Sequence, residues 1–452
     1  MSVTTQQNTT MTSEGLHLAT KESTMTHSEI ESISDSKGKG HVLILVENLP
    51  VPFDRRTWME ALALRDAGYT VSVISPAPPD DSAPFRVIEG IQVYRYSAPN
   101  PTRGKLSFVR EFAYCYLQTK RLVRKVWRIN RFDVIHSCNP PDMFWAIART
   151  YKKHGVKFVF DHHDVCPELY LSKFGREDFF YKGLCWLERK QYETADAVIA
   201  TNESYRDIAI SRGGKQLNEV TVVRSGPMLS RFKPTMPVPD LKRGRKYLVV
   251  YLGVMGPQDG VDYALRAIAE AIEQGLEETT FAFIGGGDSY EDLVELSQRL
   301  GLQDHVEFTG RIPDEQLREY LSTADLGLAP DPKNPLNDVS SMNKIVEYMA
   351  MSLPVLSFDL RESRRTAGQA AAYVPDNDER QYAKVMIELL HDLLRRQTMG
   401  STGRERVEMR LAWEHSARFL IEMYDHLLNN ENHTMQISSF EHDEADDLRR
   451  AA

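Results

Sequence analysis

Lys344 and Glu347, a lysine and a glutamate three residues apart, are the side chains in this sequence best placed to do chemistry. They lie in Ser341-Met-Asn-Lys-Ile-Val-Glu-Tyr-Met-Ala-Met351, whose apolar residues recur at helical spacing, and Leu353-Pro354 then ends the helix and starts a strand. The two side chains therefore share one helical face. Free backbone N–H groups and the helix dipole attract phosphate at this end, and Lys344 adds a full positive charge. The segment predicts a phosphate site with a hydrogen-bond acceptor beside it.

Glu347 lies one turn deeper than Lys344, where it can accept hydrogen bonds from ribose or sugar hydroxyls. Ser340 or Ser341 is expected to cap the N-terminus of the helix. A solvated salt bridge between Lys344 and Glu347 is the alternative interpretation of the same spacing.

A second polar cluster, Asp161-His162-His163-Asp164, ends an expected strand, and Glu168 follows in the same loop. Adjacent histidines on an extended chain point to opposite sides, and no further histidine or cysteine spacing completes a ligand shell. We therefore predict no metal here. A histidine in this setting is either a structural hydrogen-bonding residue or a participant in chemistry at the strand end.

Two series of alternating strands and helices position these residues. The first runs from His41 to Val223 and the second from Tyr247 to Val374, and the proline-rich segment that starts at Lys233 separates them. Short connections between strand and helix indicate parallel sheets. Such sheets bind ligands beyond the C-terminal ends of their strands, so two facing halves form a cleft. The predicted fold class is α/β, with two Rossmann-like doubly wound domains facing a central cleft.

The expected domain boundaries follow from these patterns and from the composition of the ends. They are a disordered leader at 1–39, an N-terminal domain at 40–232, a linker at 233–246, a C-terminal domain at 247–410, a helix at 411–428 placed to cross back to the first domain, and an acidic disordered tail at 429–452.

The segment around Lys344 resembles the donor-site helix of the retaining glycosyltransferases of family four. Members of that family often have (N/S)K-x-x-E-Y-M-A-x-G-x-P-V here, and this chain has Asn343-Lys344-Ile-Val-Glu347-Tyr348-Met349-Ala350-Met-Ser-Leu-Pro354-Val355. The strand end at Asp161 resembles the acceptor-side histidine motif of the same family, with His163 at the histidine position. The resemblance covers residues 41–428 and implies the GT-B arrangement of the two domains. It implies catalytic roles for Lys344, Glu347 and His163, and Ser341 and Asn343 become donor-binding candidates.

The loop after the first strand of the second half departs from the family pattern. It has Leu252-Gly253-Val-Met-Gly256-Pro-Gln-Asp-Gly260, in which Gly253 and Gly256 should allow the backbone to approach the donor phosphates. The family commonly has an arginine and a lysine in this loop, where this chain has Val254 and Asp259. This departure shifts the neutralisation of the diphosphate to Lys344, the helix N-terminus and Arg56.

A second departure concerns the two glutamates that the family spaces with seven residues between them. Glu347 matches the second, but the position eight residues earlier is Val339. Asp338 is one residue out of register and would meet the sugar if the loop bulges. Ser340 and Ser341 are the alternative groups for the sugar hydroxyls.

Further candidates lie in strand-end loops. Asn48 and Arg56 belong to the first loop, which lacks the G-x-G-x-x-G of dinucleotide enzymes and resembles the Pro-Phe-Asp-Arg-Arg opening of a bacterial surface-polysaccharide subset of the family. Arg56 would reach donor phosphate or acceptor, or it pairs with Asp54. Gly285 and Gly286 permit approach to a nucleobase or form a tight turn. Arg311 lies at the strand end where the family contacts the nucleobase. The segment Asp376-Asn-Asp378 is interpreted as a turn. A basic amphipathic segment spans residues 103–131.

Charge and composition restrict the partners. A net charge of -9 argues against nucleic acid. The longest apolar runs fall far short of the ~20 residues of a spanning helix. Four cysteines without a CxxC motif favour a reducing cytoplasm. Residues 103–131 hold nine basic residues and one acid, which predicts either docking on an anionic membrane or a surface helix packed on a core.

The resemblance implies a retaining enzyme that moves a hexosyl unit from a nucleoside-diphosphate sugar to a glycan or polyprenyl-linked acceptor, in cell-surface polysaccharide biosynthesis. It implies no metal or other cofactor. The expected location is the cytoplasm, with peripheral binding at the inner face of the plasma membrane. The alternatives are a sugar-nucleotide epimerase or hydrolase on the same fold, or a non-catalytic scaffold that binds nucleotide sugars.

Overall fold

The computed structural model describes residues 38–97, 105–375 and 377–429, and the side chains of 105–109 are not described. The leader expected at 1–39 and the tail expected at 429–452 therefore lie outside the described residues, apart from residues 38, 39 and 429. Asp376 of the expected turn also lies outside them.

A largely parallel sheet forms the centre of the first domain. Its strands are β1 (His41–Leu45), β2 (Thr70–Pro76), β3 (Phe85–Ile88), β4 (Ile91–Tyr96), β5 (Val134–Cys138), β6 (Lys157–His162), β7 (Ala197–Ala200) and β8 (Val220–Val222). Their order is β3-β4-β2-β1-β5-β6-β7-β8, and only the β3–β4 pair is antiparallel. The edge strand β3 was not anticipated from the sequence, because its four residues lack a regular apolar pattern.

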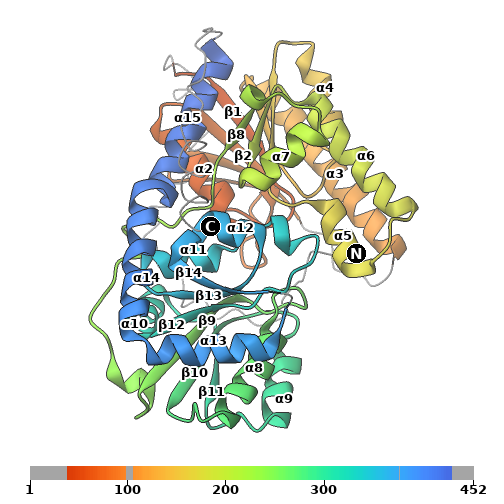
Figure 1. Ribbon diagram of the computed structural model, residues 1–452. Helices are drawn as coiled ribbons and strands as arrows, with labels where there is room; N and C mark the ends of the chain where they lie inside the picture. The colour runs from red at the N-terminus through yellow and green to blue at the C-terminus, as the bar shows by residue number, and fades with distance from the viewer. Residues whose placement is uncertain (1–37, 98–104, 376, 430–452) are drawn as a thin grey trace.

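Helices cover both faces of this sheet (Figure 1). They are α2 (Arg55–Asp66), α3 (Lys105–Ile129), α4 (Trp145–Lys152), α5 (Cys166–Phe174), α6 (Phe179–Thr194) and α7 (Glu203–Ser211). Successive side chains of β1 point to opposite cores, since Leu43 packs with α3 and α4 residues and Val42 packs with α2 residues. A strand buried on both faces explains the continuous apolar run in the sequence.

The second domain contains a wholly parallel sheet. Its strands are β9 (Tyr247–Val254), β10 (Thr279–Gly286), β11 (Val306–Gly310), β12 (Leu326–Ala329), β13 (Val355–Phe358) and β14 (Ala371–Val374), in the order β11-β10-β9-β12-β13-β14. Its helices are α8 (Val261–Glu273), α9 (Tyr290–Arg299), α10 (Asp314–Thr323), α11 (Asn343–Ala350), α12 (Arg361–Ala367), α13 (Glu379–His391) and α14 (Leu393–Arg406). The short elements are η1 (Leu217–Glu219), η2 (Pro239–Lys242), η3 (Asn337–Val339), η4 (Gly368–Ala370) and η5 (Val407–Leu411).

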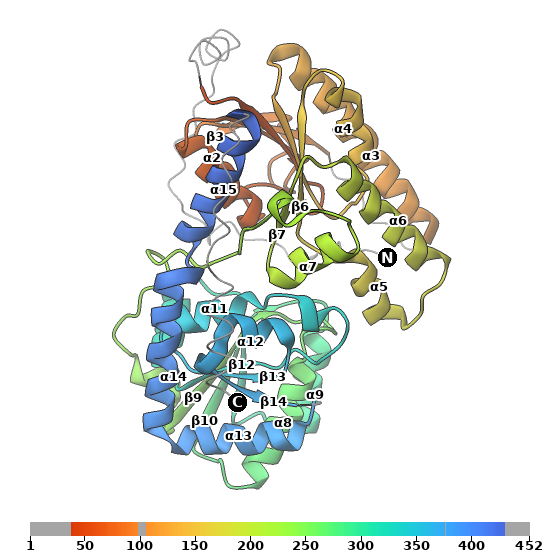
Figure 2. The ribbon, with the colours of Figure 1, turned by 45° about the horizontal axis from the view of Figure 1, so that its top comes forward.

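The last described helix, α15 (Trp413–Asn429), runs from the second domain back along the first (Figure 2). It packs against α2 and β8. Its residue Asp425 accepts a hydrogen bond from the Tyr69 hydroxyl at 2.6 Å, and its residue Tyr424 is fully buried. The C-terminal end of the described chain is thereby part of the first domain.

Polar contacts join the two domains at the start of α7. The backbone N–H and the hydroxyl of Ser204 donate to Glu362 Oε1 of α12, at 3.1 and 2.6 Å. Asn202 donates through Nδ2 to the Val339 carbonyl and to Ser341 Oγ, both at 3.0 Å. These contacts hold the carboxyl ends of the two sheets towards each other.

Candidate active site

The carboxyl edges of the two sheets meet at loops that are distant in the sequence. The Arg311 guanidinium, which follows β11, lies 5.7 Å from the ring centroid of Phe53, in the loop after β1. Arg311 is exposed, so this contact leaves its N–H groups accessible. The interdomain gap is therefore lined by strand-end residues from both halves, as open parallel sheets require.

Helix α11 begins without a side-chain cap. Its N-cap residue is Met342, and no side chain accepts a hydrogen bond from its first turn. The expectation that Ser340 or Ser341 caps the helix is wrong, because the helix starts at Asn343 and both serines bond the first domain through Asn202 and Tyr205. The Ile345 N–H bonds the Met342 carbonyl at 3.0 Å. The N–H groups of Asn343 and Lys344 are therefore the ones available to an anion.

Lys344 is buried and paired with Asp331. Its side chain is 8% exposed, and Nζ lies 2.7 Å from Asp331 Oδ1 and 5.1 Å from the ring centroid of Tyr251. The ion pair is thus made with Asp331 and not with Glu347, which corrects the alternative drawn from the helical spacing. The sequence did not point to Asp331. The sequence feature that could have identified Asp331 is a carboxylate soon after a buried strand, between Pro330 and Pro332.

A second carboxylate also lies near Lys344. Asp259 Oδ2 accepts a hydrogen bond from the Gly256 backbone N–H at 2.8 Å. Burial raises the pKa of Asp259 to about 6, the charge of Asp331 adds to the effect and that of Lys344 opposes it. An ionised Asp259 therefore competes with a phosphate for the field of Lys344.

We predict that donor affinity falls as pH rises through about 6, where Asp259 ionises. A neutral Asp259 leaves Lys344 one negative neighbour fewer, so binding of an anion takes up a proton and is favoured at low pH. Asp259→Asn should tighten nucleotide-sugar binding about tenfold near pH 8 and remove this pH dependence. Calorimetric titration from about pH 5 to about pH 8 would measure it. Parallel curves for the variant and the parent protein would show that Asp259 is not the titrating group.

Glu347 is half-buried on the same helix and faces basic groups that the sequence did not single out. Burial raises the pKa of the Glu347 carboxyl, and the charges of Arg55 and Arg231 act in the opposite direction. Arg231 is also ion-paired with Asp314 of α10. Arg55 is the first residue of α2, so a cation of the first domain meets the donor-side helix of the second.

The strand-end glycines serve two different purposes. A Cβ on Gly285 would lie 1.9 Å from the Gly253 carbonyl oxygen, and one on Gly253 would lie 3.2 Å from Lys344 Cε. Both have positive φ; Gly285 permits the close approach of β9 and β10, whereas Gly253 leaves room for the Lys344 side chain. A Cβ on Gly256 would meet the Gln258 and Asp259 side chains at 2.9 to 3.0 Å. A Cβ on Gly286 would meet no atom within 4 Å, which leaves this backbone open to a ligand.

His163 and its neighbour point to opposite sides of the strand end, as expected for consecutive residues on an extended chain. His162 Nδ1 lies 2.8 Å from the Tyr192 hydroxyl, and burial lowers the pKa of His162 to about 3. The backbone N–H of His163 donates to Asn139 Oδ1 at 2.6 Å, and Nε2 of its ring contacts Asp161 Oδ2. His163 is half-buried, so its ring is the more accessible of the two.

Arg56 is committed to the interior of the first domain, which corrects its prediction as a phosphate or acceptor ligand. Its guanidinium bonds Asp161 Oδ1 at 3.0 Å, Glu60 Oε1 at 3.0 Å and the Val223 carbonyl at 2.8 Å. The alternative pairing with Asp54 is also wrong, because Asp54 Oδ1 caps α2 by accepting the Thr57 N–H at 3.1 Å.

Asp338 does not bulge towards a sugar site. Its Oδ1 accepts the backbone N–H of Arg361 at 3.0 Å, at the start of α12. Val339, where the family pattern has its first glutamate, packs with Leu336 against the core of the first domain. That position is therefore used for contact between domains. Asn343 is exposed at the start of α11, and Asn48 is half-buried in the loop after β1.

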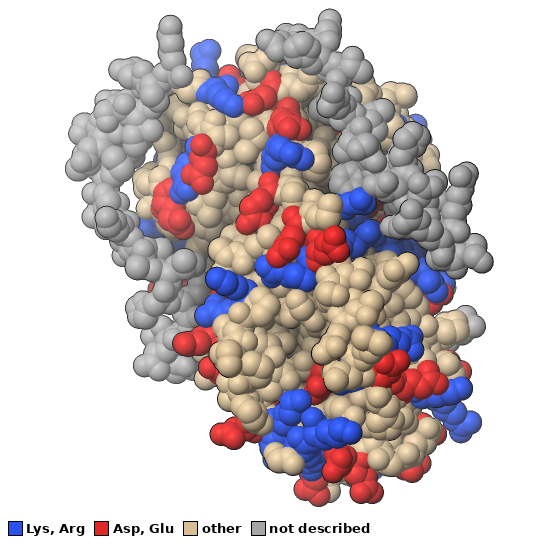
Figure 3. Space-filling model, turned by 60° about the vertical axis from the view of Figure 1, so that its left-hand side comes forward, with Lys and Arg blue, Asp and Glu red and all other residues tan. Residues whose placement is uncertain are grey.

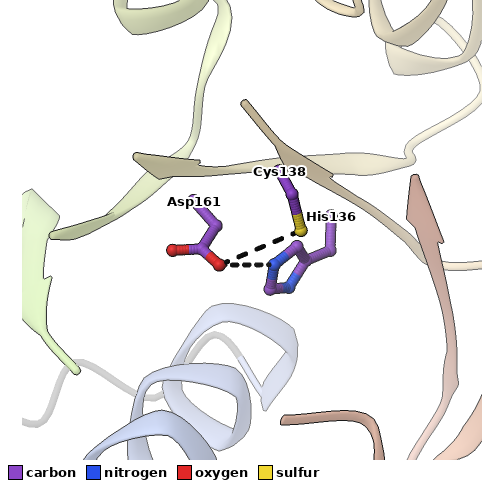
Figure 4. Close-up of side chains that lie close together, drawn as sticks. All are labelled: His136, Cys138 and Asp161. Atoms are coloured by element: carbon purple, nitrogen blue, oxygen red, sulfur yellow. Dashed lines mark hydrogen bonds and ion pairs between the residues drawn. The ribbon is translucent and has the colours of Figure 1, made fainter. Parts of the chain in front are cut away.

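Among the described residues, two overlapping groups of buried or half-buried side chains have the residue types of a metal site. They are His136, Cys138 and Asp161 (Figure 4), and Glu60, Asp161 and His163. Alternate residues of β5 and the paired residue of β6 place the first group on one face of the sheet. Burial raises the pKa of the Cys138 thiol well above its usual value, whereas a metal needs the thiolate. This chemistry fits a hydrogen-bonded polar cluster better than a metal site. Alternating polar residues in buried strands were the overlooked sequence signal.

The fold defines the class of protein. The structure resembles sucrose-phosphate synthase from Thermosynechococcus elongatus, with a TM-score of 0.72, 18% identity, and coverage of 87% of this chain and 100% of that one. It also resembles the Anabaena protein HepE in complex with UDP-glucose, with a TM-score of 0.64, 15% identity, and coverage of 85% and 98%. These are structures of the GT-B fold, which confirms the predicted fold class.

The sequence then assigns the family. Residues 54–226 match the model of the glycosyl transferase 4-like domain, and residues 246–392 match the model of glycosyl transferases group 1. The chain belongs to the family-four type of glycosyltransferases, as predicted. Among curated relatives it is 27% identical over 369 residues to the phosphatidyl-myo-inositol mannosyltransferase of Mycolicibacterium smegmatis, which covers 81% of this chain and 87% of the relative.

Proposed function

We propose that this glycosyltransferase moves a hexosyl unit from a nucleoside-diphosphate sugar to a glycan or polyprenyl-linked acceptor, with retention of anomeric configuration, in cell-surface polysaccharide biosynthesis. The observation that carries this proposal is the uncapped start of α11 with Lys344 beside it. The structural likeness to a protein bound to UDP-glucose supports a nucleotide-sugar donor. The likeness to a phosphatidyl-myo-inositol mannosyltransferase supports an acceptor linked to a lipid.

The proposed chemistry begins with cleavage of the bond between the sugar and the diphosphate. Negative charge then develops on the leaving diphosphate, and Lys344 with the N–H groups of α11 stabilises it. Arg55 and Arg231 take over the supporting role first assigned to Arg56, because the Arg56 guanidinium is largely buried and bonds Asp161 within the first domain. These groups supply the positive charge from the protein itself, and we propose that no metal is required.

The sugar acquires oxocarbenium character as the bond breaks. Glu347 and His163 are proposed to bind sugar hydroxyls in that state. We propose attack by the acceptor on the face that the diphosphate leaves, with the departing phosphate oxygen taking the acceptor proton. The route by double displacement would need a second carboxylate as nucleophile, and Asp338 is bonded to the backbone of α12 instead. Closure of the two domains would exclude water from the donor.

Native mass spectrometry with a panel of nucleotide sugars would first select the donor. Transfer to lipid-linked acceptors would then be assayed with and without a chelator, and the anomeric configuration of the product would be read by nuclear magnetic resonance. We expect an acceptor-dependent product of retained configuration in both conditions. Donor consumption without an acceptor would favour an epimerase or hydrolase, and tight diphosphate binding without product would favour a scaffold.

The basic helix α3 is the part of the molecule that we propose meets an anionic membrane. Its apolar face is already buried, since Val123 and Val126 are fully enclosed in the first-domain core. The outward face carries Leu117, which is 62% exposed, and the exposed basic residues Arg110, Arg121, Arg124 and Arg128.

On the face of the molecule that carries α14 and α15, by contrast, acidic and basic side chains are interspersed (Figure 3). Among the described residues no helix has the length and apolar character to cross a bilayer.

We predict that binding to vesicles depends on lipid charge. Each basic residue near an anionic surface contributes about 1 kcal/mol, so replacing Arg121, Arg124 and Arg128 with glutamine should weaken partitioning by about two orders of magnitude. Sedimentation with neutral and anionic vesicles would measure this, with Arg299→Gln on α9 as an exposed control. Equal binding of the unchanged protein to both kinds of vesicle would rule out attraction by charge.

A further inference from the structure

A buried chain of hydrogen bonds connects the C-terminal helix to the ring of His163. The Tyr424 hydroxyl of α15 lies 2.7 Å from His136 Nδ1. His136 Nε2 lies 3.3 Å from Asp161 Oδ2, and the same oxygen contacts His163 Nε2. Figure 4 shows the His136 ring and the Cys138 thiol directed towards this carboxylate. Tyr424, His136 and Asp161 are each fully buried.

The protonation states of these hydrogen-bonded side chains follow from burial and from the neighbouring charges. Burial tends to raise the pKa of Asp161, but the charge of Arg56 and the hydrogen bonds from His136 and His163 outweigh it and hold the pKa well below its usual value. Burial lowers the pKa of His136, so this ring is neutral. An ionised Asp161 accepts hydrogen bonds from both histidines, so His136 carries its proton on Nε2.

One arrangement of protons satisfies every member. With its proton on Nε2, His136 accepts the Tyr424 hydroxyl proton on Nδ1. His163 likewise donates from Nε2 to Asp161, which leaves its Nδ1 as the acceptor for a substrate hydroxyl. If the Tyr424 hydroxyl were absent, His136 could place its proton on Nδ1 and turn a lone pair towards Asp161. The carboxylate would then lose one of the donors that fix its orientation against His163.

We propose that Tyr424 is a positioning residue for glycosyl transfer, which acts through His136 and Asp161 to fix the tautomer and ring orientation of His163. The inference rests on the role proposed above for His163. It also assigns α15 a function, because the helix enters from the second domain and completes the hydrogen-bond chain within the first. Tyr424 does not touch the substrate in this account.

The test compares two tyrosine hydroxyls that both bond the first domain to α15. Tyr424→Phe removes the hydroxyl on His136, and Tyr69→Phe removes the hydroxyl that donates to Asp425 at 2.6 Å. The two rings are neighbours, with centroids 5.8 Å apart. Each variant removes one hydrogen bond between α15 and the first domain, but only the first alters the hydrogen bonds that lead to His163.

Histidine labelled with nitrogen-15 in the full chain would report the His163 tautomer, and kcat, its pH profile and the donor KM would be measured alongside. For Tyr424→Phe we expect a mixed His163 tautomer, a shifted pH profile and a kcat about tenfold lower, the size of one buried hydrogen bond, with donor KM unchanged. Tyr69→Phe should keep the parent values.

Three results would overturn the proposal or separate it from its premise. An unchanged His163 tautomer in Tyr424→Phe would overturn it, and so would an equal loss of kcat in both variants, because the hydroxyl would then serve only helix docking. A changed tautomer with an unchanged kcat would support the hydrogen-bond chain and would contradict the catalytic role of His163.

Discussion

Lys344→Ala is expected to lower the rate of glycosyl transfer by at least about 100-fold, the scale of losing one group that stabilises transition-state charge. The Lys344 side chain is only 8% exposed, so the field of its ammonium group is weakly screened by water. The leaving diphosphate gains charge as the sugar bond breaks, and the variant lacks the ammonium group that we propose stabilises this charge beside the N–H groups of α11. Initial rates with a saturating nucleotide sugar would measure the loss, and Lys384→Ala on the exposed side of α13 is the matched control.

The single variant also leaves the Asp331 carboxylate buried without its partner, which destabilises a folded protein. A double variant, Lys344→Met with Asp331→Asn, removes both charges and separates folding from catalysis. We expect this protein to unfold at nearly the parent temperature and to remain inactive. Recovery of transfer in the double variant, or near-normal transfer by Lys344→Ala, would exclude Lys344 from the mechanism.

His163→Ala is the second large effect that we expect, with kcat lower by about 100-fold and the donor dissociation constant changed less than about twofold. His163 belongs to the first domain, whereas the proposed phosphate contacts are made mainly by the second. Asp161 keeps Arg56 and His136 as partners in the variant, so its buried charge remains compensated. Steady-state rates with calorimetric donor titration would test this split.

The control for this variant is His154→Ala, because His154 is exposed at the end of α4 in the same domain. It should keep both kcat and donor affinity. A His163→Ala protein that turns over normally but binds donor weakly would reassign His163 to donor binding.

Much of the fold was predictable because its signals are local. Continuous apolar runs such as His41–Leu45 and helix stops such as Leu353-Pro354 involve neighbours in sequence, and their alternation indicates parallel sheets. The carboxyl ends of such sheets then determine where ligand-binding loops lie. The prediction that the Asp161–Asp164 cluster lies at a strand end and that Lys344 lies near the start of a helix needed nothing more.

Which charged groups pair with which could not be predicted, because these contacts join residues distant in sequence. Arg56 meets Asp161 at a separation of 105 residues, while its neighbour Arg55 faces Glu347 in the other domain. Both arginines look equivalent in the sequence. The direction in which each points depends on the start of α2, which Asp54 sets by capping the helix.

The amino-acid sequence by itself determined the two sheets and the family. It also determined the order of elements that brings a helix with a lysine and a strand with a histidine to the gap between the domains. These features were readable because hydrophobic periodicity and helix-breaking residues act over a few positions. Only the tertiary structure decided that Asp331 partners Lys344, that Val339 packs between domains, and that Tyr424 reaches His136 over 288 residues. Hydrogen bonds and ion pairs depend on distances of a few ångströms, and packing alone sets such distances between segments far apart in the chain.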